Sequence, residues 1–217
     1  MKLYLRLMLT LLTSMFKNKT SPLDNVVTHW RVLPTDLDLL GHMNNGRYPM
    51  IMDLARIDFI IRLGMFGKMV EQRWVVPVGN TQLDFKKALK PFAKYQIHTT
   101  LCYWDDKWFY FRQDFILDKK PDVIAATGYV KAVFRGSQGV VPSKEVIDAV
   151  MSSQSEAVER PLLTKALAQK FDLPFVSNKG DTGSSTSSKT EQTDLNENES
   201  REPIAIVGIG CRLPGGI

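Results

Sequence analysis

An apolar run that fits a helix, Pro49 to Leu63, constrains the fold of this chain more than any other feature. One extended run, Val26 to Val32, precedes it. After it come four runs that fit strands, most of them alternating between apolar and polar side chains: Thr81 to Lys86, Lys94 to Trp104, Trp108 to Leu117 and Val123 to Phe134. Short turns join the last three as hairpins. The order predicts an α+β domain in which one antiparallel five-stranded sheet wraps a central helix.

The loop between the first strand and this helix, Leu33 to Tyr48, has the chemistry of an active site. Asp36 and Asp38 offer carboxylates. Residues that suit a helix N-cap and first turn follow: Asn44, Asn45, Gly46 and Pro49. A helix start presents free N–H groups and the positive end of the helix dipole, which stabilise a carbonyl oxygen that gains negative charge. The loop can therefore both attack and polarise a carbonyl group.

The same loop contains the pattern D-x-D-x-x-G-H-x-N-N-x-x-Y, whose fixed positions are Asp36, Asp38, Gly41, His42, Asn44, Asn45 and Tyr48. This pattern resembles that of the hot-dog thioesterases. The chain resembles in particular the bacterial thioesterase-like proteins related to the animal THEM type, which share features such as the run Trp104 to Tyr110 and an apolar N-terminus. The resemblance covers about Met1 to Val150 and implies a hot-dog fold, hydrolysis of acyl thioesters and, in the related hydroxybenzoyl-CoA thioesterases, catalysis by the carboxylate at the position of Asp38.

Two interpretations of Asp38 remain open. It is either a general base or nucleophile at the thioester carbon, or a turn aspartate that accepts backbone N–H groups. Around it we expect Asn44 and the N–H of Asn45 to hold the acyl carbonyl and His42 to position the loop. Asp36 is expected to shape the turn, and the competing carboxylates on the helix are Asp53 and Asp58.

Candidate substrate-binding residues are Gly41, Tyr48, Thr81, Lys86 and Lys87. The two lysines belong to a group around Pro91 that also includes Lys90 and Lys94. Such a group suits the phosphates of coenzyme A or of a carrier arm, and the alternative is a solvated strand end.

The composition limits the chemical classes of partner and cofactor that suit this chain. The net charge of +5 and the pI near 9.1 suit an anionic partner, without the dense basic runs of a nucleic-acid binder. Cys102 and Cys211 lie far apart without metal-ligand spacing, which argues against a zinc site or a disulfide framework and for a reducing compartment. We expect no metal or redox cofactor; coenzyme A or phosphopantetheine enters only as part of the substrate.

Residues 1–20 are predicted to form an amphipathic helix. Arg6, Thr10 and Thr13 recur on one side, and Leu5, Met8, Leu9, Leu12 and Phe16 lie opposite. The apolar stretch is too short to span a membrane. A helix on the membrane surface and a helix docked on its own domain or on a dimer mate are both open, with a cleaved secretory signal third.

The domain organisation follows from composition. We expect a hot-dog domain at 24–151, a helical extension at 152–176 with a helix from Glu159 to Gln169, and a disordered linker at 177–202 that is rich in polar residues. Residues 203–217, with Glu202 before them, resemble the opening strand and turn of a modular polyketide or fatty-acid ketosynthase. They are read as a truncated start of that domain, without its catalytic residues.

The sequence as a whole predicts a cytoplasmic acyl thioesterase acting on an acyl-CoA or acyl-carrier-protein substrate, with a link to polyketide or fatty-acid biosynthesis. A sheet of this kind leaves unpaired edges, so a homodimer or higher oligomer is expected. The alternative is a non-catalytic acyl-binding or scaffolding module attached to a polyketide synthase or a membrane surface.

Overall fold

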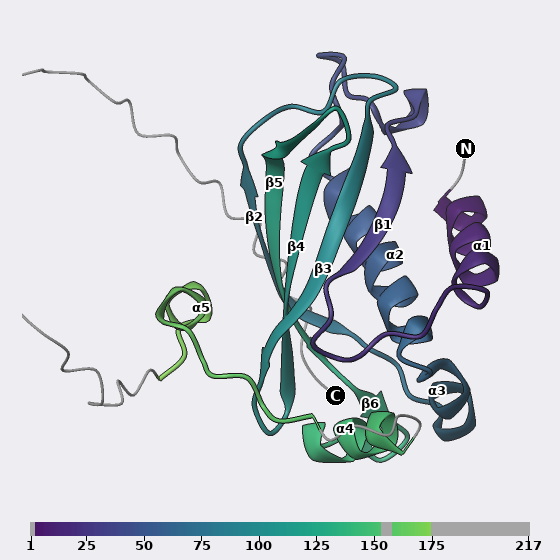
Figure 1. Cartoon of the computed structure of the whole chain (residues 1–217), viewed down its shortest axis with the longest axis vertical. Helices are drawn as coiled ribbons and strands as arrows, with labels where there is room; N and C mark the ends of the chain where they lie inside the picture. Colours follow the sequence, from purple (N-terminus) through teal and green to yellow (C-terminus); the bar gives the residue numbers. More distant parts are fainter. Residues whose placement is uncertain (1–2, 153–157, 175–217) are drawn as a thin grey trace, which may run out of the picture. The chain divides into compact units, whose positions relative to one another are not determined.

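The computed structural model describes residues 3–152 and 158–174 of the 217-residue chain, so the predicted linker at 177–202 and the ketosynthase-like strand at 203–217 lie outside the described residues. Figure 1 shows the arrangement of the elements. In chain order they are α1 (Leu3–Ser14), β1 (Val26–Arg31), the 3-10 helix η1 (Pro34–Asp36), α2 (Arg47–Arg62), α3 (Phe66–Gln72), β2 (Val78–Phe85), β3 (Lys94–Trp104), β4 (Trp108–Leu117), β5 (Lys120–Val133), β6 (Arg135–Gly136), β7 (Gly139–Val140), α4 (Ser143–Met151) and α5 (Lys165–Phe171).

Five strands form one antiparallel sheet in the order β1-β3-β4-β5-β2. Its inner face packs against α2, which crosses it as the central helix (Figure 1). Ile51, Met52, Ala55 and Phe59 are at most 1% exposed along that side of the helix, because apolar residues three and four apart share one helix face. This architecture confirms the predicted hot-dog fold.

A glycine on β5 sets how closely α2 approaches the sheet. A Cβ atom built on Gly128 would overlap the side chain of Met52, which is fully buried. At the start of α2, Tyr48 packs between Phe85 of β2 and Phe115 of β4, with ring centroids 5.0 and 4.9 Å away. The first turn of the helix is therefore fixed by core packing, and the loop from Leu33 to Tyr48 is anchored at that end.

The N-terminal helix docks on its own domain, but through its polar side. Arg6 and Thr10 are each 8% exposed and Ser14 is 1% exposed, whereas the apolar residues opposite them face outward. The sequence predicted a two-faced helix without showing which face turns inward. The physical reason is that Arg6 and Ser14 meet buried carboxylates of the domain, and a buried charge requires a partner. No helix in the described part of the chain has the length and apolar character needed to cross a membrane.

Several element boundaries differ from those predicted. The helix expected from Glu159 begins only at Lys165, because Pro161 precedes it and Thr164 provides an N-cap that accepts a hydrogen bond from the N–H of Leu167 at 3.3 Å. The last strand begins at Lys120 instead of Val123. The short helix α3 was not predicted, since its seven residues bury no side chain and so carry no clear apolar period.

Candidate active site

The loop between β1 and α2 is held by a buried carboxylate. Asp36 is 3% exposed, and its oxygens accept hydrogen bonds from the guanidinium of Arg6 at 2.6 and 3.1 Å and from the N–H of Leu33 at 2.9 Å. Its backbone carbonyl accepts a further bond from the N–H of Asn44 at 2.8 Å. Asp36 therefore ties both ends of the loop together and to α1, which confirms its predicted role in shaping the turn.

Asp38 lies at the tip of the loop and is half-buried. Its Oδ1 accepts hydrogen bonds from the N–H groups of Leu40 at 2.9 Å and His42 at 3.2 Å, while its own N–H donates to the carbonyl of His42 at 2.9 Å. Gly41 closes this turn with a φ of +73°, a conformation that glycine adopts without strain. Among the described residues, Oδ2 of Asp38 has no hydrogen-bond partner. The turn thus fixes the carboxylate and leaves one oxygen available for a substrate.

The start of α2 follows directly. Oδ1 of Asn44 accepts a hydrogen bond from the N–H of Gly46 at 2.8 Å, and the carbonyl of Asn44 accepts one from Arg47 at 2.9 Å. Asn45 is exposed, and its backbone N–H finds no acceptor among the residues that the structure describes. Asn44 therefore supports the turn into the helix, and the N–H of Asn45 is available to an oxyanion.

The other predicted residues of the loop have different surroundings. The imidazole of His42 makes no hydrogen bond within the described chain, so His42 contributes through its backbone bonds to Asp38. Tyr48 is 2% exposed, and burial raises its pKa to about 12. A substrate contact at Tyr48, as the sequence suggested, requires an acyl chain to enter the core beside it.

A cavity of about 710 Å³ lies at the end of the sheet nearest this loop and is lined by lysines. They are Lys87, Lys90, Lys94, Lys119 and Lys120, with Asp118 as the acidic residue among them. The segment that carries the first two is joined to the active-site loop by the hydrogen bond from the N–H of Met43 to the carbonyl of Leu89 at 2.9 Å. Lys119 and Lys120 were missed from the sequence because the pairing of β3 with β4 brings them there: Tyr95 pairs with Leu117, and the N–H of Asp118 donates to the carbonyl of Lys94 at 3.2 Å.

Of the five predicted substrate contacts only Lys87 lines this cavity; Gly41, Tyr48, Thr81 and Lys86 do not. Lys86 is exposed, and its N–H donates to the carbonyl of Ala125 at 2.9 Å. Thr81 is exposed on the edge strand β2, opposite Val130 of β5. The structure does not bring Thr81 and the lysine cavity together into one site on this chain.

Of the two competing carboxylates on α2, Asp53 is the more accessible, with its side chain 57% exposed. It pairs with Arg56, which also donates to Oε1 of the buried Gln113 at 2.7 Å. Burial raises the pKa of Asp53 above its ordinary value, and the charge of Arg56 opposes that rise. Because its carboxylate is accessible on the helix, Asp53 remains the competitor of Asp38.

Asp58 lies on the opposite side of α2 and is fully buried. Its Oδ1 accepts hydrogen bonds from the hydroxyl of Ser14 at 2.5 Å and the ammonium of Lys17 at 2.7 Å. The helix α1 therefore covers this carboxylate, which assigns Asp58 a structural role in place of the predicted competing catalytic one.

The family model described as the thioesterase-like superfamily matches residues 32–162, more than half of the chain. The chain therefore belongs to the thioesterase-like superfamily. Protein THEM6 of Drosophila melanogaster is 28% identical over 148 residues, which cover 68% of this chain and 72% of that protein. Protein THEM6 of Xenopus laevis is 32% identical over 132 residues, or 60% of each chain. The predicted hot-dog, THEM-like relationship is confirmed, although the match spans less than two thirds of the Xenopus protein.

Related names and folds recur among other proteins. The probable thioesterase YBR096W of Saccharomyces cerevisiae is 26% identical over 118 residues, which cover 53% of this chain and 50% of that protein. The structure of the YbaW probable thioesterase from Escherichia coli has a TM-score of 0.53 at 19% identity and covers 60% of this chain and 98% of that one. The DHNA-CoA thioesterase from Staphylococcus aureus has a TM-score of 0.52 at 18% identity, with 63% and 98% covered. These two structures show the fold.

Proposed function

We propose that this chain hydrolyses acyl thioesters and that Asp38 is the catalytic carboxylate. The observation that carries the proposal is the geometry of Asp38, whose Oδ1 is held by two backbone N–H groups while Oδ2 remains unpaired within the described residues. The N–H of Asn45 lies seven residues further along the same loop and is the donor for the oxyanion. Preorganised donors of this kind contribute about 3 to 4 kcal/mol of transition-state stabilisation.

Two mechanisms use the same carboxylate. As a general base, Asp38 removes a proton from water while the water oxygen attacks the thioester carbon; the thiolate then leaves and takes up that proton. As a nucleophile, Oδ2 of Asp38 attacks the carbon itself, the thiolate leaves, and water hydrolyses the resulting anhydride to return the carboxylate. The products, a carboxylic acid and a thiol, are the same.

Replacement of the carboxylate tests the proposal. We expect Asp38→Asn to lower kcat by about 10²- to 10⁴-fold with an unchanged unfolding midpoint, because the amide oxygen still accepts the N–H groups of Leu40 and His42. Asp53→Asn is the matched control on α2 and is expected to retain activity. Near wild-type turnover of Asp38→Asn together with an inactive Asp53→Asn would place the base on the helix instead.

Labelled water separates the two mechanisms. In a single turnover in ¹⁸O-water, label in the side chain of Asp38 identifies a nucleophile, because only attack of water on Cγ of the anhydride puts it there. A general base leaves the side chain unlabelled and puts the label only in the acid product. Mass spectrometry of the peptide that contains Asp38 reads the difference.

For the substrate we propose an acyl-CoA or an acyl carrier protein. The lysine-lined cavity supports an anionic carrier, since phosphate and carboxylate groups pair with lysine ammonium groups. The resemblance of Glu202 to Gly216 to a ketosynthase opening supports a link to polyketide or fatty-acid biosynthesis. A hydrolysis panel across acyl lengths, run with both CoA and carrier-protein thioesters, identifies the substrate.

The second candidate is a non-catalytic acyl-binding or scaffolding module. It is favoured by the turn-forming hydrogen bonds of Asp38, which a structural aspartate also makes. Acyl-CoA binding by calorimetry without turnover in the hydrolysis panel would establish this alternative. In either case we propose a cytoplasmic homodimer, with the reducing compartment supported by the sparse cysteines.

A further inference from the structure

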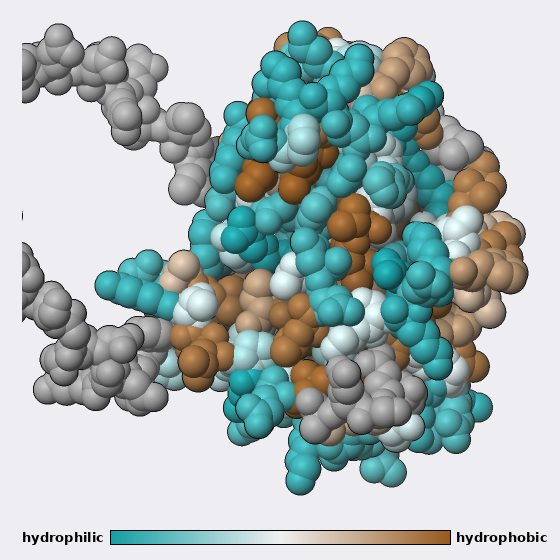
Figure 2. Space-filling view, viewed as in Figure 1, coloured by the Kyte–Doolittle hydropathy of each residue, from teal (hydrophilic) through white to brown (hydrophobic). Residues whose placement is uncertain are grey.

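The outward side of α1 and the turn after it form an apolar stripe, which we define as Tyr4, Met8, Leu12, Met15 and Phe16. These side chains are 56–89% exposed. Figure 2 shows apolar residues along the border of the molecule where Figure 1 places α1. Contiguous exposed apolar surface on a soluble domain marks a place of contact, so the stripe requires an occupant.

The inward side of α1 prevents the helix from rolling over to bury the stripe. Arg6 is bound to Asp36, and Ser14 and Lys17 are bound to Asp58. Both carboxylates are at most 3% exposed. A rotation of α1 would leave Asp36 without its counter-ion and Asp58 with only Arg62 of its own helix, 3.9 Å away, which is strongly unfavourable for buried charges. The stripe is therefore held outward by the packing of the domain itself.

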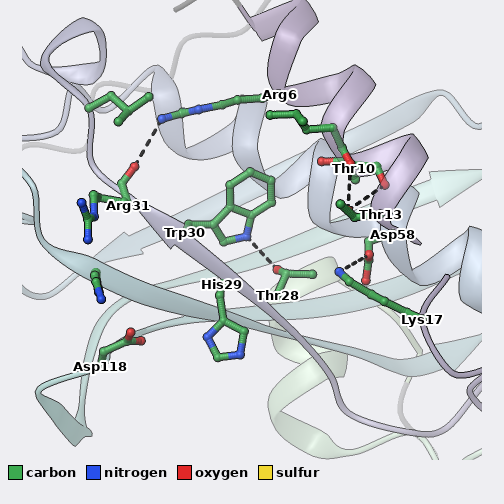
Figure 3. Close-up of a pocket in the computed structure, with 13 residues that line it drawn as sticks. Arg6, Thr10, Thr13, Lys17, Thr28, His29, Trp30, Arg31, Asp58 and Asp118 are labelled. Carbon is green, nitrogen blue, oxygen red and sulfur yellow. Dashed lines mark hydrogen bonds and ion pairs between the residues drawn. The ribbon is translucent and has the colours of Figure 1, made fainter. Parts of the chain in front are cut away.

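The surroundings of the stripe are basic. Residues 1–19 contain four cationic side chains, Lys2, Arg6, Lys17 and Lys19, and no aspartate or glutamate. Arg6 and Lys17 neutralise Asp36 and Asp58, while Lys19 is exposed and makes no ion pair within the described chain. A cavity of about 530 Å³ between α1 and β1 adds Arg31 and Lys94, which lie opposite each other on neighbouring strands, and also includes Asp58 and Asp118 (Figure 3). Cations thus lie beside an apolar helix face about 18 Å long, the length of 12 residues.

We propose that the stripe docks this protein on an anionic lipid bilayer, with α1 lying in the plane of the membrane interface. Apolar side chains on one side of a helix and Lys or Arg beside them are the features of an interfacial helix, and anionic lipids complement the basic surroundings. A two-fold contact between copies would set the same basic residues against each other. The ion pair between Arg6 and Asp36 then connects the membrane-facing helix directly to the candidate active-site loop.

Vesicle co-sedimentation of the full chain tests the proposal without any substrate, so its outcome is independent of thioester hydrolysis. The chain is mixed with vesicles of phosphatidylcholine plus phosphatidylserine, and with vesicles of phosphatidylcholine alone. Glutamine keeps the helix propensity high, so the test variant is Met8→Gln/Leu12→Gln. The matched control, Val70→Gln/Leu162→Gln, removes two apolar side chains that are 64% and 87% exposed elsewhere.

We expect the wild type and the control to bind the anionic vesicles, and the test variant to bind them at least about tenfold more weakly. Binding is also expected to weaken with added salt and on neutral vesicles. Equal binding of the test variant and the wild type would overturn the proposal. So would a doubled mass in light scattering that the test variant abolishes, which identifies a second copy. Amide-exchange protection at residues 204–209 that the test variant removes would identify the chain's own tail as the occupant.

Discussion

Asp36 and Asp38 are two residues apart in one loop, and their surroundings give them different roles. Asp36 is buried against the guanidinium of Arg6 and binds the N–H of Leu33. Asp38 is half-buried, bonds only to backbone N–H groups through one oxygen, and keeps the other unpaired within the described chain. The first carboxylate therefore acts as a structural anchor, and the second is available for chemistry.

The ion pair between Arg6 and Asp36 predicts how single substitutions change the free energy of unfolding. We expect Arg6→Met to lower the free energy of unfolding by about 3 to 5 kcal/mol, because the carboxylate of Asp36 would remain buried without its counter-ion. Urea denaturation measures the loss. The double variant Arg6→Met/Asp36→Asn is expected to lose less than the sum of the two single variants, since both charges are then absent. A loss below about 0.5 kcal/mol for Arg6→Met, as for a surface residue, would contradict this role.

The catalytic candidates illustrate what the loop sequence could reveal. The positions of Asp38, Gly41 and Asn44 in one turn were predictable, because each makes hydrogen bonds or adopts a φ angle within the loop itself. The partner of Asp36 was not, since Arg6 lies 30 residues away. The pairing of Arg56 with Gln113, 57 residues apart, was missed for the same reason.

Among the elements, the β3–β4 hairpin contains a turn organised by one carboxylate. Asp105 accepts hydrogen bonds from the N–H groups of Lys107 and Trp108 at 2.8 and 2.7 Å, and from the hydroxyl of Tyr110 at 2.7 Å. Burial alone would raise the pKa of Asp105, but the bonds from Tyr110, Trp108 and Lys107 outweigh it and lower the pKa below its ordinary value. The folded state thus favours the ionised form.

This turn predicts a pH-dependent contribution to stability. Because the folded pKa of Asp105 is lowered, its contribution is present above the unfolded value of about 4 and is lost as the pH falls through the folded pKa. We expect Asp105→Asn to lower the unfolding free energy at pH 7 by about 1 kcal/mol, a modest value because the turn is partly exposed. Urea denaturation at neutral and acidic pH checks it. A difference between variant and wild type that grows on acidification would contradict the assignment.

The helices and strands also show where the periodicity of the sequence fails to predict the structure. β3 and β4 were predictable because one face of each is buried, which imposes period two on the sequence. α2 was predictable from its long apolar run, most of which is buried. For α1 the period was clear but its orientation was not, since the usual expectation that apolar residues face inward is reversed by two buried carboxylates on other elements. Ion pairs between residues far apart in the chain leave no local pattern in the sequence.

For the whole molecule, the two edges of the sheet are unlike. The β1 edge has α1 beside it (Figure 1), and Arg6 donates to the carbonyl of Arg31 at 3.3 Å. On the other edge, β2 pairs only with β5 in the described chain, and most of its residues are exposed. An open edge of this length favours pairing with another strand. The β2 edge is therefore where we expect a second copy to join.

The dimer prediction follows from that edge. We expect the wild type to scatter light as a dimer at micromolar concentration, and Val78→Lys/Thr81→Lys to scatter as a monomer, because two-fold pairing would set like charges opposite each other. His29→Lys, an exposed position on the opposite edge strand, is the control and should remain dimeric. A monomeric wild type that still hydrolyses thioesters would contradict the prediction.

The ion pair between Arg6 and Asp36 has a practical consequence for anyone preparing this protein. An apolar N-terminus is commonly trimmed to improve solubility, and here the trimmed segment would include Arg6. The shortened protein would dissolve more readily while Asp36, the anchor of the active-site loop, lost its counter-ion. An inactive preparation of that kind would reflect a loosened loop. Assays on it would underestimate the hydrolytic activity of the full chain.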